Sequence, residues 1–77
     1  MTRGEYLVGI DFNPSADDMV GQIKRKAADL IDLIDSIDAA PGERLRLKSL
    51  AITAIEEGAM WGVKAATKPP RPEVKDA

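Results

Sequence analysis

The sequence contains neither cysteine nor histidine, and this limits how such a short chain can be stabilised. Without cysteine no disulfide can form, and without both residue types the usual zinc ligand sets cannot be assembled. A single domain of 77 residues buries only about 60% of the surface that its unfolded chain exposes, which leaves a core of marginal stability. We therefore expect the chain to gain stability by forming a homo-oligomer.

Long hydrophobic runs are also missing. The longest uninterrupted apolar runs are a few residues, far below the roughly 20 residues that cross a bilayer. The N-terminus lacks the apolar segment of a secretory signal. We therefore expect no membrane association and a cytosolic location, with which the absence of cysteine is compatible.

Strong charge of one sign is absent as well. The chain has 11 basic and 13 acidic side chains and a net charge of −2, so it has no general attraction for a nucleic acid polymer, and any anion site must be local. General-base or nucleophilic chemistry near neutral pH would then depend on lysine, carboxylate or hydroxyl groups whose pKa values are strongly shifted. Walker, GxGxxG, HExxH and EF-hand patterns are missing. We expect a protein that is not an enzyme and uses no cofactor and no metal.

The first 16 residues predict a non-helical lead. Gly4 and Gly9 interrupt this stretch, residues 6–8 and Ile10 are β-prone, and residues 13–15 have the composition of a turn. Ser15 or the pair Asp17-Asp18 can cap the helix that follows, because their oxygens accept backbone N–H groups at the positive end of a helix dipole.

Two amphipathic helices follow the lead. Apolar residues recur at spacings of three and four from about residue 17 to 38 and predict a helix there. Residues 39–42, Ala-Ala-Pro-Gly, break this pattern, and a second helix is predicted over about 43–67. The fold class is therefore all-α: an antiparallel helical hairpin over 17–68, a short N-terminal lead over 1–16 and a Pro-rich flexible tail over 69–77, assembling into a symmetric oligomer.

Two features of these helices have more than one explanation. Gly58 and Gly62 lie inside the second helix at a spacing of four, where each glycine costs about 1 kcal/mol relative to alanine. Either close packing within the hairpin, or a ligand or second subunit against that face, would explain them. In the first helix, Asp29, Asp32, Asp35 and Asp38 are three residues apart. They indicate a solvated polar face rather than a metal site, because such a spacing drifts around a helix.

A candidate anion site is suggested by basic residues at one end of the hairpin. Lys24, Arg25 and Lys26 lie in the first half of the first helix, and Lys64 and Lys68 lie at the end of the second, so an antiparallel arrangement brings the two groups to the same end. Solvated lysines are the simpler explanation for any one of them. Phe12, Trp61 and Thr67 add aromatic faces and a hydroxyl, the parts that hold a phosphorylated base. Trp61 alone fits a core or interface position, and Phe12 alone fits a hydrophobic staple.

Three stretches of the chain, taken together, resemble a family of small phage proteins. These are the anti-CBASS and anti-Thoeris cyclic-oligonucleotide sponges, which share a helical-hairpin domain. The stretches span most of residues 11–68 and are Asp11-Phe12-Asn13-Pro14-Ser15, the run from Ile23 to Leu33, and the run from Ala59 to Thr67.

The resemblance implies a phage protein that acts in the cytoplasm of the infected bacterial host. It would form a hexamer that binds cyclic dinucleotides such as cGAMP, and cyclic trinucleotides, without cleaving them, and so would block CBASS effectors. The family's stacking aromatic corresponds to Phe12, with Tyr6 as the competing candidate, and its phosphate-binding lysine to Lys24. The arginine of a second, trinucleotide pocket corresponds to Lys64, and lysine lacks the bidentate fork of arginine.

The sequence therefore predicts a ligand-binding set and leaves one rival function open. The set comprises Phe12, Lys24, Lys26, Trp61, Lys64 and Thr67. The rival is an oligomeric helical module that binds protein partners through its wide apolar faces, has no nucleotide ligand and merely exposes its lysines to solvent.

Overall fold

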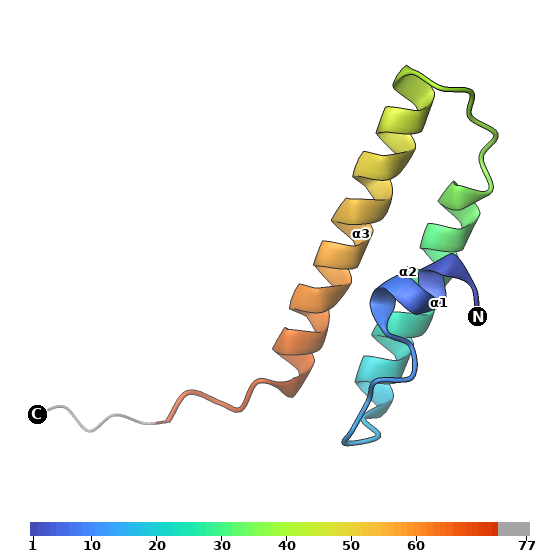
Figure 1. The fold of residues 1–77 in the computed structure, drawn as a ribbon. Helices are drawn as coiled ribbons and strands as arrows, with labels where there is room; N and C mark the ends of the chain where they lie inside the picture. The colour runs from blue at the N-terminus through green and yellow to red at the C-terminus, as the bar shows by residue number, and fades with distance from the viewer. Residues whose placement is uncertain (73–77) are drawn as a thin grey trace, which may run out of the picture.

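Two long antiparallel helices and one short helix make up the fold. The computed structural model describes residues 1–72, in which the helices are α1 (Arg3–Val8), α2 (Asp18–Asp35) and α3 (Glu43–Thr67), and this described part contains no strand. In Figure 1, α3 runs alongside α2 in the opposite direction, and α1 lies against α2. The predicted all-α hairpin is confirmed. The last five residues of the predicted tail, 73–77, lie outside the described part.

α2 begins and ends on side-chain hydrogen bonds. Asp17 is its N-cap and accepts the backbone N–H of Val20 at 3.2 Å. The predicted helix reached residue 38, but α2 ends at Asp35. Its end is fixed from outside, because the Lys48 ammonium on α3 donates to the backbone carbonyls of Asp35 and Ile37. A cation at the negative end of a helix dipole is favourable, and here it also satisfies carbonyls that the helix leaves free.

α3 has the predicted bounds. It follows Gly42, whose φ of 125° is open to glycine and strained for other residues. Within α3, Gly58 and Gly62 differ in their surroundings. A Cβ on Gly62 would lie 3.5 Å from the Ile23 side chain on α2, whereas nothing lies within 4 Å of a Cβ on Gly58. Packing within the hairpin therefore accounts for Gly62 and not for Gly58.

The hydrophobic core is small. Its buried members are Val20, Ala28, Ile31, Ile52 and Ala59, and of these Ile31 is the largest that is fully enclosed. Many large apolar side chains remain exposed in the single chain. They include Leu30, Leu33, Ile37, Leu45, Leu47, Leu50, Met60 and Trp61. Exposed apolar side chains on this scale are typical of a surface that contacts another molecule.

The prediction of a non-helical lead is wrong, because residues 3–8 form α1. Thr2 and Glu5 make a capping box: the Thr2 hydroxyl accepts the Glu5 N–H at 3.1 Å, and the Glu5 carboxylate accepts the Thr2 N–H at 2.8 Å. Gly9, with φ 63°, ends the helix in the left-handed conformation. The T-x-x-E spacing was visible in the sequence and outweighs the β-prone residues between these two caps.

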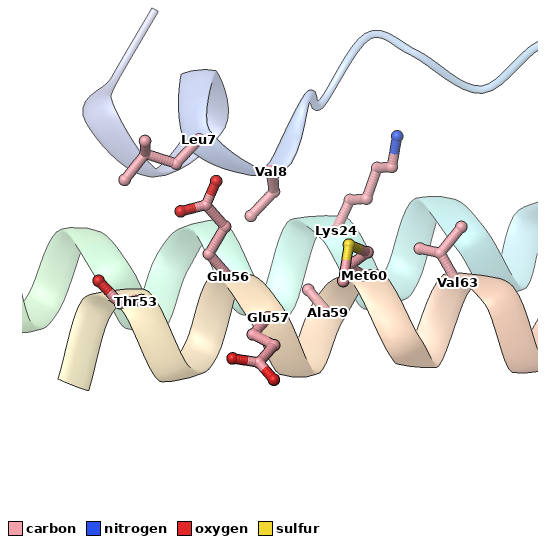
Figure 2. Close-up of a pocket in the computed structure, with 9 residues that line it drawn as sticks. All are labelled: Leu7, Val8, Lys24, Thr53, Glu56, Glu57, Ala59, Met60 and Val63. Carbon is pink, nitrogen blue, oxygen red and sulfur yellow. The ribbon is translucent and has the colours of Figure 1, made fainter. Parts of the chain in front are cut away.

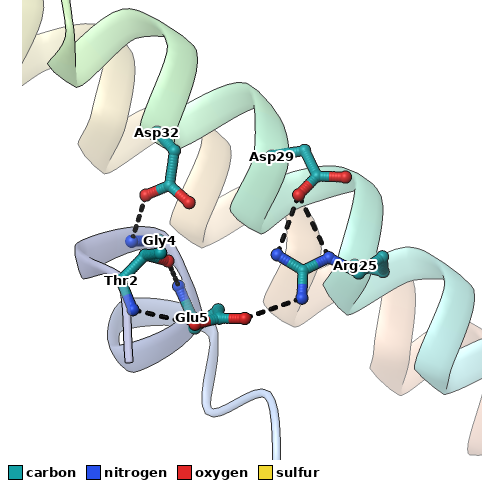
Figure 3. A network of polar contacts seen from close by, with 6 residues as sticks. All are labelled: Thr2, Gly4, Glu5, Arg25, Asp29 and Asp32. Carbon is teal, nitrogen blue, oxygen red and sulfur yellow. Dashed lines mark hydrogen bonds and ion pairs between the residues drawn. The ribbon is translucent and has the colours of Figure 1, made fainter.

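α1 is held against α2 by a very close backbone approach at Gly4. Gly4 is buried, and a Cβ at this position would overlap the Ala28 carbonyl oxygen and lie 2.8 Å from Asp32 Oδ1. The Gly4 N–H donates to the same Asp32 oxygen at 2.8 Å (Figure 3). Only glycine fits this contact without displacing the helix.

Arg25 makes a second link between α1 and α2. Its guanidinium donates to Glu5 at 2.8 Å and to Asp29 of its own helix at 2.8 and 3.1 Å (Figure 3). The bond from Arg25, followed by the Thr2 backbone N–H, lowers the pKa of Glu5 from 4.5 to about 2. The same bonds, with Glu5 first and Asp29 next, raise the pKa of Arg25.

These contacts change the interpretation of the aspartate run on α2. Asp29 accepts from Arg25, Asp32 from the Gly4 N–H, and Asp35 from Arg3 at 2.8 Å. The run is therefore not only a solvated face, since three of its carboxylates bind the α1 segment or the arginine that holds it. Among the described residues, no three acidic side chains gather as a metal site would require.

The Gly4 contact predicts a position-specific effect of a single methyl group. Gly4→Ala should lower the free energy of unfolding by about 1–3 kcal/mol, because the new Cβ meets a backbone carbonyl that cannot yield without moving a helix. Gly21→Ala on α2 is the matched control, since its Cβ meets only Asn13 at 3.9 Å, and it should stabilise by up to about 1 kcal/mol. Urea unfolding of both variants tests this, and equal effects would contradict it.

The Glu5 network predicts acid-induced release of α1. A carboxylate with a lowered pKa in the folded state contributes stability that is complete above its unfolded value of 4.5 and is lost as the pH falls toward about 2. The protection factors of the α1 amides, measured against the intrinsic exchange rate at each pH, should therefore fall over this interval before those of α2 and α3. In Glu5→Gln the protection factors of α1 should no longer show this pH-dependent step. An unchanged step in the variant would assign it to another group.

Candidate functional site

Lys24 is the best-defined charged group near the predicted site. It lies on α2, is only 6% exposed, and its ammonium donates to the Gly9 carbonyl at 2.8 Å and also to the Phe12 carbonyl. Figure 2 shows the amine pointing toward the segment that follows α1. Lys24 therefore ties that segment, residues 9–12, to α2. An ammonium has three N–H donors, so one remains beyond these two bonds.

Phe12 lies directly beside this ammonium. Its ring centroid is 5.4 Å from Lys24 Nζ, within the range of a cation–π contact, and 73% of the residue is exposed. Such exposure does not fit a hydrophobic staple buried against the first turn of α2. Tyr6, the competing aromatic, lies on α1 and is equally exposed at 74%. Of the two aromatics, Phe12 is the one in contact with the Lys24 cation.

Lys24 also lines a groove of about 440 Å³ between α1, α2 and α3. Leu7 and Val8 of α1 form one wall (Figure 2), and the remaining lining residues are Lys24, Thr53, Glu56, Glu57, Ala59, Met60 and Val63. Its surface is mainly apolar, and the Glu56 carboxylate, which points toward α1 (Figure 2), repels a phosphate group. An anion that reaches Lys24 should therefore approach from the Phe12 side and not through this groove.

Trp61 and Lys64 form a second cation–aromatic pair on α3. Lys64 Nζ lies 5.4 Å from the Trp61 ring, and the indole N–H is 3.4 Å from a Glu57 oxygen. Both residues are exposed. Thr67 lies one turn beyond Lys64, and its hydroxyl donates to the Val63 carbonyl at 2.8 Å. Because the hydroxyl proton is donated to this helix carbonyl, the Thr67 oxygen can act toward other groups only as a hydrogen-bond acceptor.

The three consecutive basic residues on α2 point to different surroundings. Lys24 is buried against residues 9–12, Arg25 binds Glu5 and Asp29, and Lys26 is exposed. The structure thus brings together two pairs from the predicted set, Phe12 with Lys24 and Trp61 with Lys64. It does not join Lys26 or Thr67 to either pair through a direct contact in the described residues.

Sequence reasoning missed how the first pair is supported. The Gly9 and Phe12 carbonyls are backbone groups and carry no sequence signal of their own. Arg25, Glu5 and Gly4 hold α1 in place and so set where this segment begins. The only available signal was the capping box at Thr2 and Glu5, which predicts a helix and hence a short, constrained connection before α2.

In a comparison with protein-family models, residues 5–67 match the Acb2/Tad1 hairpin domain. The match begins within α1, includes all of α2 and α3, and covers most of the chain. The chain belongs to this family. No curated protein and no solved structure matches the chain.

Membership in the Acb2/Tad1 family confirms the resemblance seen in the sequence and gives the general role. The family comprises phage anti-CBASS and anti-Thoeris sponges, which sequester cyclic oligonucleotide signals and are not enzymes. The matched hairpin includes both cation–aromatic pairs. In the described residues, none of the helices has the length and hydropathy needed to cross a membrane.

The Lys24 clamp predicts a stability effect that an exposed lysine would not have. Lys24→Met keeps the apolar stem but removes the donors to two backbone carbonyls, and should lower the free energy of unfolding by about 1.5–3 kcal/mol. Lys26→Met, two residues away and exposed, is the matched control and should stay within about 0.5 kcal/mol of the wild type. Chemical unfolding of the two variants decides between a structural and a purely solvated Lys24.

Proposed function

We propose that this chain is a phage anti-defence sponge for cyclic dinucleotides such as cGAMP and for cyclic trinucleotides. It binds these immune signals without cleaving them in the cytoplasm of the infected host and so keeps them from CBASS effectors. Sequestration works by mass action, so the protein must be abundant and must bind the signal more tightly than the effector does. The observation that carries the proposal is the Lys24–Phe12 pair within a hairpin of the Acb2/Tad1 family.

The Lys24–Phe12 pair provides the two interactions that a cyclic dinucleotide needs. The exposed Phe12 ring offers a π-face on which a base can stack, and the ammonium next to it offers charge for a phosphate. A phosphate oxygen reaches Lys24 either through its third donor or by replacing one of the two backbone carbonyls. Either route brings the ligand in over residues 9–12, away from Glu56 and Glu57.

The second pair supports a separate site at the end of α3. Lys64 and Trp61 repeat the combination of cation and aromatic face, and Thr67 adds a hydroxyl acceptor one turn later. We assign the cyclic trinucleotide to this pair, with Lys26 as a further exposed cation on α2. A lysine makes a single-point contact with phosphate where an arginine would make a bidentate one, so this site should be the weaker of the two.

The assembled form of the sponge is proposed to be a homohexamer. A small ligand with two or three phosphates suits a symmetric interface, because each chain then supplies the same cation once. The small core and the exposed apolar side chains of the single chain support assembly. Cleavage is not proposed, because the chain has neither histidine nor cysteine for proton transfer or attack near neutral pH.

Isothermal titration calorimetry with a cyclic dinucleotide tests the function, using two aromatic variants as a matched pair. Phe12→Ala should weaken binding by the value of one stacked base, about 1–3 kcal/mol. Tyr6→Ala removes an equally exposed aromatic and should leave affinity unchanged. Neither ring is part of the core, so circular dichroism should show both variants folded.

The results separate the rival functions. Loss of affinity in Tyr6→Ala but not in Phe12→Ala would assign the stacking role to Tyr6 and contradict the Phe12 site. Absence of heat with both cyclic dinucleotides and cyclic trinucleotides would contradict the sponge and favour a protein-interaction module. A hydrolase would release linear products, whereas a sponge returns the ligand unchanged after the protein is denatured, as chromatography can show.

A further inference from the structure

The connection between α1 and α2, residues 9–17, is neither helix nor strand, yet its backbone is held at several points. The Gly9 carbonyl accepts the Phe12 N–H at 2.9 Å, which closes a turn, and it also accepts the Lys24 ammonium at 2.8 Å. The same ammonium donates to the Phe12 carbonyl. The first half of the connection is therefore fixed from α2.

Asn13 fixes the second half of the connection. Its side-chain amide donates to the Asp17 carbonyl at 2.9 Å and accepts the Asp17 N–H at 3.0 Å, so both of its polar groups bind the backbone of the residue that caps α2. The Asn13 carbonyl accepts the Ala16 N–H at 2.9 Å. The side chain is half-buried and lies beside α2, since a Cβ on Gly21 would be 3.9 Å from its amide nitrogen.

These bonds hold Ala16 in a strained backbone conformation. Its φ of 50° lies in the left-handed region, which is uncommon for a residue that carries a Cβ. Such a conformation persists only where the surrounding structure fixes it, and conformations of this kind cluster at functional sites. Ala16 is exposed, so packing of its own side chain does not hold it there. The bonds of Asn13 on either side of Ala16 do.

Phe12 lies between the two fixed halves of the connection. Its carbonyl, which Lys24 binds, belongs to the same peptide group as the N–H of Asn13. The ring of Phe12, in contrast, is free of the core, since 73% of the residue is exposed. An exposed aromatic on a fixed backbone loses little conformational freedom when a flat group stacks on it, and this favours binding.

We propose that Asn13 is a positioning residue for the Phe12 ring. Its bonds to Asp17 order the connection before a ligand is present, and the side chain itself does not touch the ligand. Without these bonds Ala16 can leave the left-handed region, and the Phe12 ring then samples many positions although its contact residues remain in the chain. The inference rests on the proposed function, because it names the residue that presents the aromatic of that site.

The order of the connection without ligand is the first test. In ¹⁵N relaxation, the amides of Phe12, Ala16 and Asp17 should have order parameters near about 0.85, as in rigid backbone, and below about 0.6 in Asn13→Ala. Ser15→Ala is the matched control and should leave the order parameters unchanged, because Ser15 is exposed and its hydroxyl takes part in none of these bonds.

Titration calorimetry with a cyclic dinucleotide is the second test. Asn13→Ala should weaken binding about tenfold. The loss should appear as a less favourable binding entropy, because the variant orders its connection only when the ligand binds. Ile52→Val removes one methylene group from the buried core on α3 and is the control for stability. It should lower the free energy of unfolding and leave affinity and binding entropy unchanged.

Three results would overturn the positioning role. These are a wild-type connection that is already flexible, an Asn13→Ala variant that keeps the wild-type affinity, and an equal loss of affinity in Ile52→Val, which would assign the effect to overall stability. The proposed function fails in a different way. Absence of heat with every cyclic nucleotide in the wild type would contradict the sponge itself, whatever the order of the connection.

Discussion

The structure around the candidate site depends on one buried cation. The Lys24 ammonium holds the backbone of residues 9–12 through two carbonyls and lies beside the Phe12 ring. This contact decides where the chain crosses from α1 to α2 and which side of the hairpin carries the exposed aromatic. For the proposed ligand at Lys24, binding would be coupled to the conformation of residues 9–12, because the same ammonium holds that segment.

The second constraint is the small size of the core. Among residues 1–72, five apolar side chains are buried, while many larger ones are exposed on the surface of the single chain. A domain with so little enclosed apolar area is expected to be marginal alone. α3 shows the contrast within one helix, because Ile52 and Ala59 are buried against the hairpin while Leu50 and Trp61 are exposed. In the proposed assembly, contacts between chains would supply the burial that the single chain lacks.

α1 connects these two constraints. Its capping box, the close contact of Gly4 with α2 and the Arg25–Glu5 bond fix the start of the segment that Lys24 holds. Three aspartates of α2 take part in this docking, which explains a spacing that otherwise indicates only a polar helix face. The lowered pKa of Glu5 makes the docking of α1 sensitive to acid. Glu5 lies on α1, so its protonation acts on this docking and not on the contacts between α2 and α3.

The sequence by itself determined the two long helices, their antiparallel order and the bounds of α3, because apolar spacing and the Pro-Gly break are local signals. It also carried the family resemblance and the presence of Phe12, Lys24, Trp61 and Lys64. The Thr2–Glu5 capping box was a local signal for a helix over residues 3–8, but only the tertiary structure shows the docking against α2 that supports so short a helix. The tertiary structure alone paired Phe12 with Lys24 and left Gly58 without a neighbour, because backbone carbonyls and the open side of a helix have no sequence code.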